Sequence, residues 1–346
     1  MTSTRLFFEL PKDLEAHEPP EARGVARDGV RMLVAYRSTG RLIDSCFGLL
    51  PRFLESGDLV VVNTSATIPA AIDTVLAGKA PVVIHLSTWI GGDIWVVEPR
   101  RSRGKGTVRW HGEKLPRAMM LGEGAQIELL EPYRGSDRLW IARVELPEAA
   151  SSWLATHGRP IRYEYVEMSW PISYYQNVFA TEPGSAEMPS AGRPFSREVI
   201  EALLAKSVGV APIVLHTGVA SLDADEYPFP ERVRVPRKTA EVVNAAHEAG
   251  RRVVAVGTTV VRALESAADS NGHVQALDDW TSLVVTPERG VKVVDAILTG
   301  WHEPETSHLL MLEAIAGREL LEGSYAAAIA ARYRWHEFGD THLVLP

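Results

Sequence analysis

The sequence predicts an α/β fold, in which a discontinuous α/β domain is interrupted by a small inserted β-barrel-like domain. From about residue 196 onward, strand-like and helix-like segments alternate, as they do where helices cover a sheet. Before this part, short strand-like runs are separated by glycines, which is typical of a small barrel or sandwich. We therefore expect residues 1–71 and 149–346 to form the α/β domain and residues 72–148 to form the inserted β-barrel-like domain.

Hydrophobic patterning and turn residues place each element along the chain. The first segment has two apolar runs that predict buried strands, at 31–36 and 59–62. The strands predicted in the inserted segment are 82–84, 94–97, 107–110, 127–130 and 139–144. Those predicted in the C-terminal part are 210–215, 252–256, 283–285, 291–298 and 342–345. The helices predicted there are 196–205, 237–249, 258–268, 307–315 and 319–332, of which Ser196 caps the first.

The composition is that of an ordinary globular protein, with 346 residues, 46% of them hydrophobic, and a formal net charge of −8. An acidic chain needs a local basic patch to bind nucleic acid. The single cysteine, Cys46, cannot form an internal disulfide or a structural zinc site, which indicates a reducing compartment. Residues 1–10 do not resemble a signal peptide, and no stretch approaches the roughly 20 apolar residues of a membrane span. We therefore expect a soluble, cytoplasmic protein.

The clearest local signal is a strand followed by a glycine and a helix, at 253–265. Gly257 allows a ligand to approach the backbone, and the hydroxyls of Thr258 and Thr259 join the free N–H groups of the helix. Such donor-rich pockets lie at the carboxyl ends of strands in open α/β sheets. The alternative interpretation is that Thr258 is only a helix cap. Arg262 is spaced to pair with Glu265 on one helix face.

Two further predicted strands end in histidine. His216 follows the strand at 210–215, and His302 follows the strand that contains Asp295. A histidine near neutral pKa can take or give a proton, although a lone histidine is more often a structural hydrogen-bonding residue. A carboxylate buried in a strand needs a partner, so Asp295 is either a paired structural group or a site residue. Polar strand ends in one sheet could converge on one cleft.

Two other stretches are candidates for ligand contacts. The loop at 184–195 is rich in Gly, Ser, Ala and Pro and either wraps a flat ligand or connects two elements. In the inserted segment, basic residues lie close to Trp95 and Trp110, which suits RNA backbone and bases, or else they form a solvated charged hairpin. These basic residues are Arg100, Arg101, Arg103, Lys105 and Arg109.

An ordered set of short motifs resembles the S-adenosylmethionine:tRNA ribosyltransferase-isomerases of queuosine biosynthesis. The matching segments include 8–11, 31–34, 57–63, 175–179, 183–185, 189–192, 215–218, 256–266, 293–295 and 301–304. The resemblance implies the same interrupted α/β fold. It also implies a reaction in which the ribosyl part of S-adenosylmethionine moves onto 7-aminomethyl-7-deazaguanine in tRNA to give epoxyqueuosine, with release of adenine and methionine. It implies S-adenosylmethionine as co-substrate, tRNA as partner and no metal.

The resemblance also suggests roles for individual residues. His302 is the candidate for acid/base work, with Glu231 and Asp295 as its partners. Arg100, Arg101, Arg103 and Lys105 are the candidate nucleic-acid contacts. The candidates for binding S-adenosylmethionine are His216, Gly218, Gly257, Thr258, Thr259, Arg262, Pro189, Ala191, Gly192 and Thr299.

The sequence departs from the family pattern around the candidate pocket. A histidine of the family's Pro-Thr-Ala-Gly-Leu-His-Phe loop is Pro194 here, and two early arginines are Ala66 and Ala71. The family's downstream Met-His-x-Glu keeps only Glu231, because Phe229 stands at the position of its histidine. Two alternatives therefore stand beside the tRNA enzyme. One is a paralogue that uses S-adenosylmethionine on a small-molecule acceptor, and the other is a non-catalytic nucleoside-binding protein.

Overall fold

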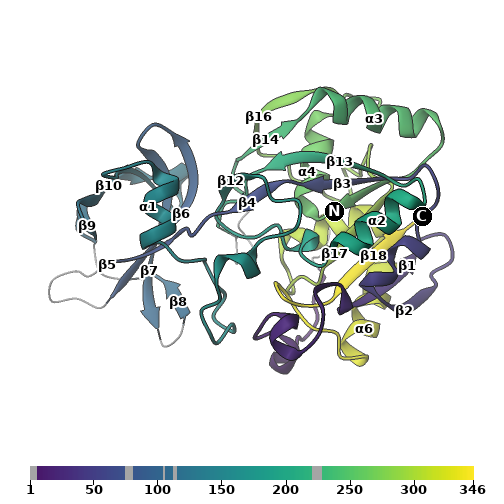
Figure 1. Ribbon diagram of the computed structural model, residues 1–346, viewed down its shortest axis with the longest axis horizontal. Coiled ribbons are helices and arrows are strands. Elements are labelled where there is room, and N and C mark those ends of the chain that lie inside the picture. The colour runs from purple at the N-terminus through teal and green to yellow at the C-terminus, as the bar shows by residue number, and fades with distance from the viewer. Residues whose placement is uncertain (1–5, 75–80, 104–105, 112–114, 220–227) are drawn as a thin grey trace.

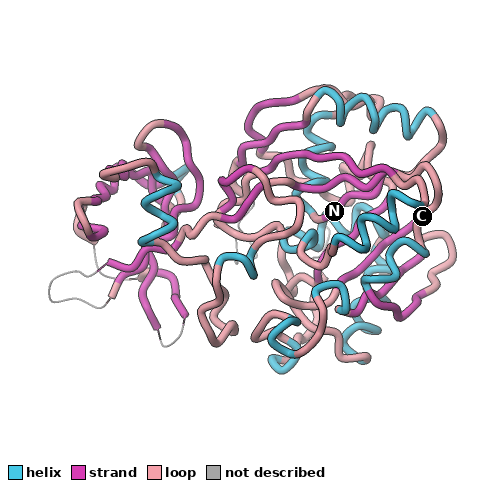
Figure 2. Tube along the Cα trace, viewed as in Figure 1, coloured by secondary structure: helices cyan, strands magenta, loops and turns pink. Residues whose placement is uncertain are grey.

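Two large β-sheets form the framework of the computed structural model, one at each end of the long axis (Figure 1). The structure describes residues 6–74, 81–103, 106–111, 115–219 and 228–346. Helices gather around the larger sheet, whereas the smaller one consists almost entirely of strands and loops (Figure 2). The described helices include none that is long and apolar enough to cross a membrane.

The larger sheet has nine strands in the order β16-β14-β13-β3-β15-β17-β18-β1-β2. Its central strands β13, β3, β15 and β17 are parallel, so their carboxyl ends meet at one edge. The strands are β1 (Arg31–Tyr36), β2 (Leu42–Cys46), β3 (Leu59–Asn63), β13 (Gly209–Leu215), β14 (Glu231–Val235), β15 (Val253–Val256), β16 (Leu277–Thr281), β17 (Ala296–Gly300) and β18 (Thr341–Leu345).

Helices cover both faces of this sheet because its central strands are apolar on both sides. In β3, Leu59 and Val61 face one core, and Val60 and Val62 face the other. The second of these cores is covered by α2 (Arg197–Ala205), whose first turn is capped by the Ser196 hydroxyl, as predicted. The first core is covered by α3 (Arg237–Glu248), α4 (Thr258–Ala267), α5 (Ser307–Ala316) and α6 (Arg318–Ala330).

The smaller sheet has seven strands and is nearly closed. Its two outer strands approach each other where the Thr74 hydroxyl donates to the Met120 carbonyl over 2.5 Å. Helix α1 (Ala150–His157) buries Trp153 and Leu154 in the same core. The strands are β5 (Ala71–Thr74), β6 (Val82–Gly91), β7 (Ile94–Arg103), β8 (Gly106–Arg109), β9 (Ala118–Gly122), β10 (Ala125–Pro132) and β11 (Trp140–Glu145).

Short elements join the two sheets. Strands β4 (Ser65–Thr67) and β12 (Glu182–Ser185) pair in parallel where the chain leaves the larger sheet and where it returns. Short 3₁₀ helices lie at Lys12–Leu14, Pro20–Arg23, Arg27–Gly29, Phe47–Arg52, Tyr133–Gly135, Ile172–Tyr175 and Ser190–Gly192.

Two of the predicted strands are wrong in position. Residues 283–285 do not form a strand; the strand in this region is β16, which has mostly exposed side chains and no apolar run to reveal it. The strand predicted at 291–298 begins only at Ala296, so Asp295 lies just before it. The predicted C-terminal helices are all present, with ends that differ by a few residues.

Candidate functional site

A pocket opens at the carboxyl ends of β13, β15 and β17, and β6 of the smaller sheet contributes one wall. Among the residues proposed from the sequence, those that line it are Pro189, Ala191, Gly218, Glu231, Gly257, Thr258, Thr259, Arg262, Thr299 and His302. Residues from five separate stretches of the chain thus converge on one cavity. The wall from β6 consists of Ser87 and Thr88.

The turn at Gly257 requires glycine. Its φ of +90° and ψ of 160° are nearly inaccessible to residues with a side chain, and a Cβ there would lie 3.2 Å from the Ala191 Cβ. Gly257, not Thr258, is the N-cap, so the capping interpretation of Thr258 is wrong. Thr258 and Thr259 form the first turn of α4 and face the pocket, where the helix N-terminus favours negative or oxygen-rich groups.

Asn63 at the end of β3 fixes the neighbouring strand ends. Its side-chain amide donates to the Leu215 carbonyl over 2.8 Å and to the Thr259 hydroxyl over 3.3 Å, and its oxygen accepts from the Leu215 N–H. His216 follows Leu215 but turns away from the pocket, with Nδ1 2.7 Å from the Ser65 hydroxyl. His216 therefore does not line the pocket, and its contact with Ser65 supports the strand end beside it.

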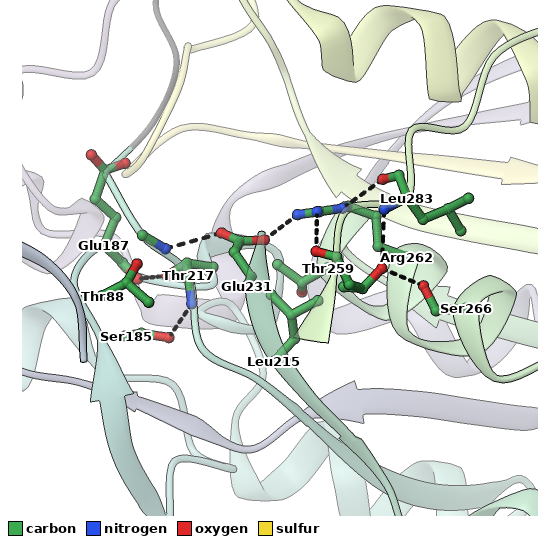
Figure 3. Close-up of polar contacts among 12 residues, drawn as sticks. Thr88, Ser185, Glu187, Leu215, Thr217, Glu231, Thr259, Arg262, Ser266 and Leu283 are labelled. Atoms are coloured by element: carbon green, nitrogen blue, oxygen red, sulfur yellow. Dashed lines mark hydrogen bonds and ion pairs between the residues drawn. The ribbon is translucent and has the colours of Figure 1, made fainter. Parts of the chain in front are cut away.

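Glu231 and Arg262 form an ion pair at the centre of the site (Figure 3). The second carboxylate oxygen of Glu231 accepts from the Gly218 N–H over 2.9 Å. The guanidinium of Arg262 also donates to the carbonyls of Leu283 and Thr281, over 3.1 and 3.3 Å. Because both of its oxygens are engaged, Glu231 holds the loop after β13 against α4. The predicted pairing of Arg262 with Glu265 is wrong.

His302 is buried beside the pocket. Its Nε2 lies 3.0 Å from the Thr299 hydroxyl, and its ring stacks on His308 with centroids 4.5 Å apart. Its Nδ1 has no hydrogen-bond partner among the described residues. Burial, together with the nearby His308, His336 and His342, holds the pKa of His302 well below its usual value, so the imidazole is neutral at pH 7.

Asp295 is not part of the pocket, which corrects the expectation that it partners His302. It lies at the opposite end of β17, because the strand starts directly after it. Its carboxylate accepts from the Val253 N–H over 2.8 Å and lies 3.3 Å from Nε2 of His247. Gly192, another predicted site residue, does not line the pocket either. A Cβ on Gly192 would lie 3.3 Å from the side-chain nitrogen of Asn177.

Four further residues line the pocket. Glu187 and Glu303 lie in stretches that the sequence already marks, at 184–195 and 301–304, whereas nothing in the sequence points to Tyr163 or His336. Glu187 accepts from the Tyr163 hydroxyl over 2.9 Å, and both residues line the cavity. Glu303 and His336 lie with Oε1 and Nδ1 2.9 Å apart. His336 comes from the loop before β18, where no motif points to a site. Only its distance to Glu303 in three dimensions reveals it.

The predicted basic hairpin is formed by β7 and β8, and its arginines differ in environment. Arg100 is directed inward, where it donates to Glu98 and to the Thr107 hydroxyl, both over 2.8 Å. It is therefore not a free nucleic-acid contact, which corrects that part of the prediction. On the other face of the strand, the guanidinium of Arg101 lies 4.8 Å from the Trp110 ring centroid, and Arg103 is exposed. Lys105 lies outside the described residues.

The pocket combines a few polar groups with an apolar wall. Within the described ranges, no group of three or more His, Cys, Asp or Glu residues is arranged to hold a metal ion. Apolar side chains such as Met188, Val285 and Met311 form much of the wall beside the polar groups, as in most small-molecule sites.

Comparison with known proteins shows the family of this chain. A sequence model of the family described as Queuosine biosynthesis protein matches residues 4–344. The S-adenosylmethionine:tRNA ribosyltransferase-isomerase of Desulfitobacterium hafniense is 33% identical over 98% of both chains, and that of Thermotoga maritima is 33% identical over 100% of both. The crystal structure of the S-adenosylmethionine tRNA ribosyltransferase from Thermotoga maritima superposes with a TM-score of 0.55 at 29% identity, covering 98% of this chain and 99% of that one. The chain therefore belongs to the queuosine biosynthesis protein family.

Proposed function

We propose that this protein is an S-adenosylmethionine:tRNA ribosyltransferase-isomerase. It transfers the ribosyl moiety of S-adenosylmethionine to 7-aminomethyl-7-deazaguanine in tRNA, forms epoxyqueuosine and releases adenine and methionine. The observation that carries the proposal is the convergence of the strand ends at 215–218, 256–259 and 299–302 on one pocket in a chain that matches the family over nearly its whole length. The names of the relatives give no support to a small-molecule acceptor.

The pocket has the groups needed to bind S-adenosylmethionine. The N–H groups of Thr258 and Thr259 precede the first backbone hydrogen bond of α4, which runs from the Val260 N–H to the Gly257 carbonyl, so they can bind a carboxylate or ribose oxygen beside the two threonine hydroxyls. The apolar wall, including Ala191, suits the adenine and the methionine chain. Arg262 and Glu231 neutralise each other, so the pair keeps the loop in place without repelling the sulfonium cation.

We propose that His302 acts as a base. The positive sulfonium acidifies the adjacent C5′ hydrogens, so a modest base can remove one of these protons. A neutral imidazole whose Nδ1 has no partner among the described residues can take it, while the Thr299 hydroxyl holds the ring through Nε2. The accurate placement of donors and base is the contribution that this chain makes to the reaction.

The smaller sheet supplies a surface for tRNA. We infer that the inserted domain comprises residues 72–148 together with helix α1, because the described strands β5–β11 form a sheet separate from the nine-stranded one and α1 packs in its core. On it, Arg101 and Arg103 combine positive charge with the aromatic ring of Trp110, a combination that suits RNA phosphates and bases. Because the protein as a whole carries a net negative charge, binding of tRNA requires such a local positive patch.

The deciding experiment incubates the protein with S-adenosylmethionine, alone, with tRNA that bears the aminomethyl-deazaguanine base, and with the free base. Release of adenine and methionine only in the presence of that tRNA supports the proposal. Release with the free base alone would instead indicate a small-molecule acceptor. Binding of S-adenosylmethionine by calorimetry without any release would indicate a non-catalytic binding protein.

Substitution of His302 tests its role. We expect His302→Ala to lower the turnover by roughly 10²- to 10⁴-fold, the usual contribution of general acid–base catalysis, while S-adenosylmethionine still binds. The control is His273→Ala, because His273 is exposed and lies outside the pocket. Full turnover by a folded His302→Ala variant would remove His302 from the mechanism.

A further inference from the structure

A second cavity adjoins the candidate pocket and shares three residues with it. It lies between the N-terminal segment, strand β7 and the segment at 161–167, where its lining includes His17, Glu98 and Arg162. Tyr163, Glu187 and Glu303 line both cavities, so the two meet at these side chains. Acidic, basic and phenolic groups all contribute to the walls of the second cavity, and such walls suit a charged ligand that forms hydrogen bonds.

The ion pair of His336 and Glu303 stands at this junction. Nδ1 of His336 lies 2.9 Å from Oε1 of Glu303, and both residues line the candidate pocket. The ring of His336 is 5.4 Å from that of His302 and 5.5 Å from that of Tyr163, measured between centroids. A ligand that enters from the second cavity and reaches the base His302 therefore passes close to the His336 ring.

The charges around His336 set it apart from the other histidines of the pocket. Burial alone would lower its pKa, but Glu303, and after it Glu337 and Glu187, raise the pKa above its usual value. The pKa of Glu303 is lowered by His336 against the opposing effect of burial. In contrast, burial lowers the pKa of His308 to about 4 and that of His302 well below its usual value. Among these three, His336 is the ring that exchanges a proton nearest to neutral pH.

We propose that His336, oriented by Glu303, is the general base that deprotonates the amine of the acceptor, and that the second cavity admits the acceptor. This inference rests on the proposed function. A primary ammonium has no lone pair, so it cannot attack the ribosyl fragment. The neutral His336 ring takes one proton from it, so the positive charge moves to the imidazole. The freed lone pair then forms the new C–N bond to the ribosyl fragment as the bond of that fragment to adenine breaks. Adenine leaves with that electron pair and takes the extra proton of the new secondary ammonium. The Glu303 carboxylate stabilises the imidazolium. His336 is thus a catalytic residue, and Glu303 is a positioning residue.

The sign of the pH dependence follows from this role. The base must be unprotonated, so the transfer rate falls as the pH drops below the pKa of His336. Removing the charge of Glu303 lowers that pKa, because an imidazolium loses its nearest counterion. The acidic limb of the profile of Glu303→Gln therefore lies at lower pH than that of the wild type, by about one unit or more, and its plateau is lower because the base is weaker.

The test compares wild type, His336→Gln and Glu303→Gln in single-turnover transfer from S-adenosylmethionine to the modified tRNA, from about pH 6 to about pH 9. The matched control is His247→Gln, which breaks another histidine–carboxylate pair, with Asp295, at the opposite end of the sheet. We expect His336→Gln to lower the transfer rate by about 100-fold or more, with S-adenosylmethionine affinity unchanged by calorimetry. We expect the control to keep both the rate and the pH profile of the wild type.

The outcomes separate this inference from the proposed function. An unchanged rate and pH profile in folded His336→Gln, beside an active wild type, overturns the inference and leaves the proposed function standing. No release of adenine and methionine by the wild type overturns both. If His336→Gln does not fold, Glu303→Gln decides: a shift of the acidic limb to lower pH supports the inference, and an unshifted limb overturns it.

Discussion

At the scale of single residues, Gly257 links a backbone conformation to the proposed ligand site. Its φ of +90° is readily adopted only by glycine. A Cβ at this position would lie 3.2 Å from the Cβ of Ala191. We expect Gly257→Ala to reduce the free energy of unfolding by about 1–3 kcal/mol, from urea denaturation, and to weaken S-adenosylmethionine binding because the first turn of α4 shifts. Gly250→Ala is the matched control, since Gly250 also has a positive φ, of 64°, but has open space around it. Equal ligand affinity in both variants would contradict a role for this turn.

A second prediction at this scale concerns the contribution of the ion pair of Arg262 and Glu231 to stability. Arg262 is 6% exposed, so its removal leaves a carboxylate with little access to water. We expect Arg262→Met to lower the free energy of unfolding by roughly 3–5 kcal/mol, and the double variant with Glu231→Gln to recover part of this difference. The exposed pair of Arg197 and Glu201 is the control, because Arg197→Met should cost less than about 1 kcal/mol. An effect at Arg262 as small as this would contradict a buried, structural pair.

At the scale of elements, the sequence predicts those that carry a strong apolar pattern and misses those that do not. Strand β3 and helix α4 are predicted from buried runs and a glycine turn, and the structure has them there. Strand β16 could not be predicted, because its side chains are mostly exposed and its place is set by pairing with β14. The same reason decides which site residues can be predicted. His302 could be proposed because it follows a predicted strand. His336 could not, because it lies in an irregular loop and approaches His302 only through tertiary packing.

Strand β18 carries a buried histidine that makes stability depend on pH. His342 stacks on Trp301 at 4.7 Å, and neither of its ring nitrogens has a hydrogen-bond partner among the described residues. Burial lowers the pKa of His342 to about 3. Because the unfolded chain binds this proton below about pH 6.5 and the folded chain does not, the unfolded state gains protons and the free energy of unfolding falls as the pH drops from that value.

Replacement of this histidine should remove part of the acid sensitivity. Phenylalanine keeps a flat ring against Trp301 but binds no proton. We expect the decrease in unfolding free energy between pH 7 and about pH 5 to be about 2 kcal/mol smaller in His342→Phe than in the wild type. Urea denaturation at both pH values measures it. The control is His273→Phe at an exposed position, which should keep the pH dependence of the wild type. If His342→Phe also keeps it, His342 does not contribute to the acid sensitivity.

At the scale of the whole molecule, the two sheets divide the work of the proposed reaction. The larger sheet supplies the strand ends of the pocket, and β6 of the smaller sheet closes one side with Ser87 and Thr88. The Ser87 hydroxyl accepts from the Val219 N–H over 3.0 Å, which ties the loop after β13 to the smaller sheet. A tRNA bound along the smaller sheet, as proposed, would therefore lie on the side of the pocket that β6 forms.

This arrangement predicts how tRNA affinity responds to charge and salt. Arg101 and Arg103 lie on the hairpin of β7 and β8, far from α3 in Figure 1. We expect the double variant Arg101→Glu with Arg103→Glu to bind tRNA more weakly. Its salt dependence of binding should be smaller by about one in log–log slope for each phosphate that the variant no longer neutralises. The matched control reverses the same number of charges in α3, at the exposed Arg237 and Lys238, and should bind nearly as the wild type does.

Because the proposed site for S-adenosylmethionine lies at the strand ends of the larger sheet, its affinity should not change in either variant. Equal tRNA affinity and equal salt slopes in both double variants would place the RNA surface elsewhere on the molecule.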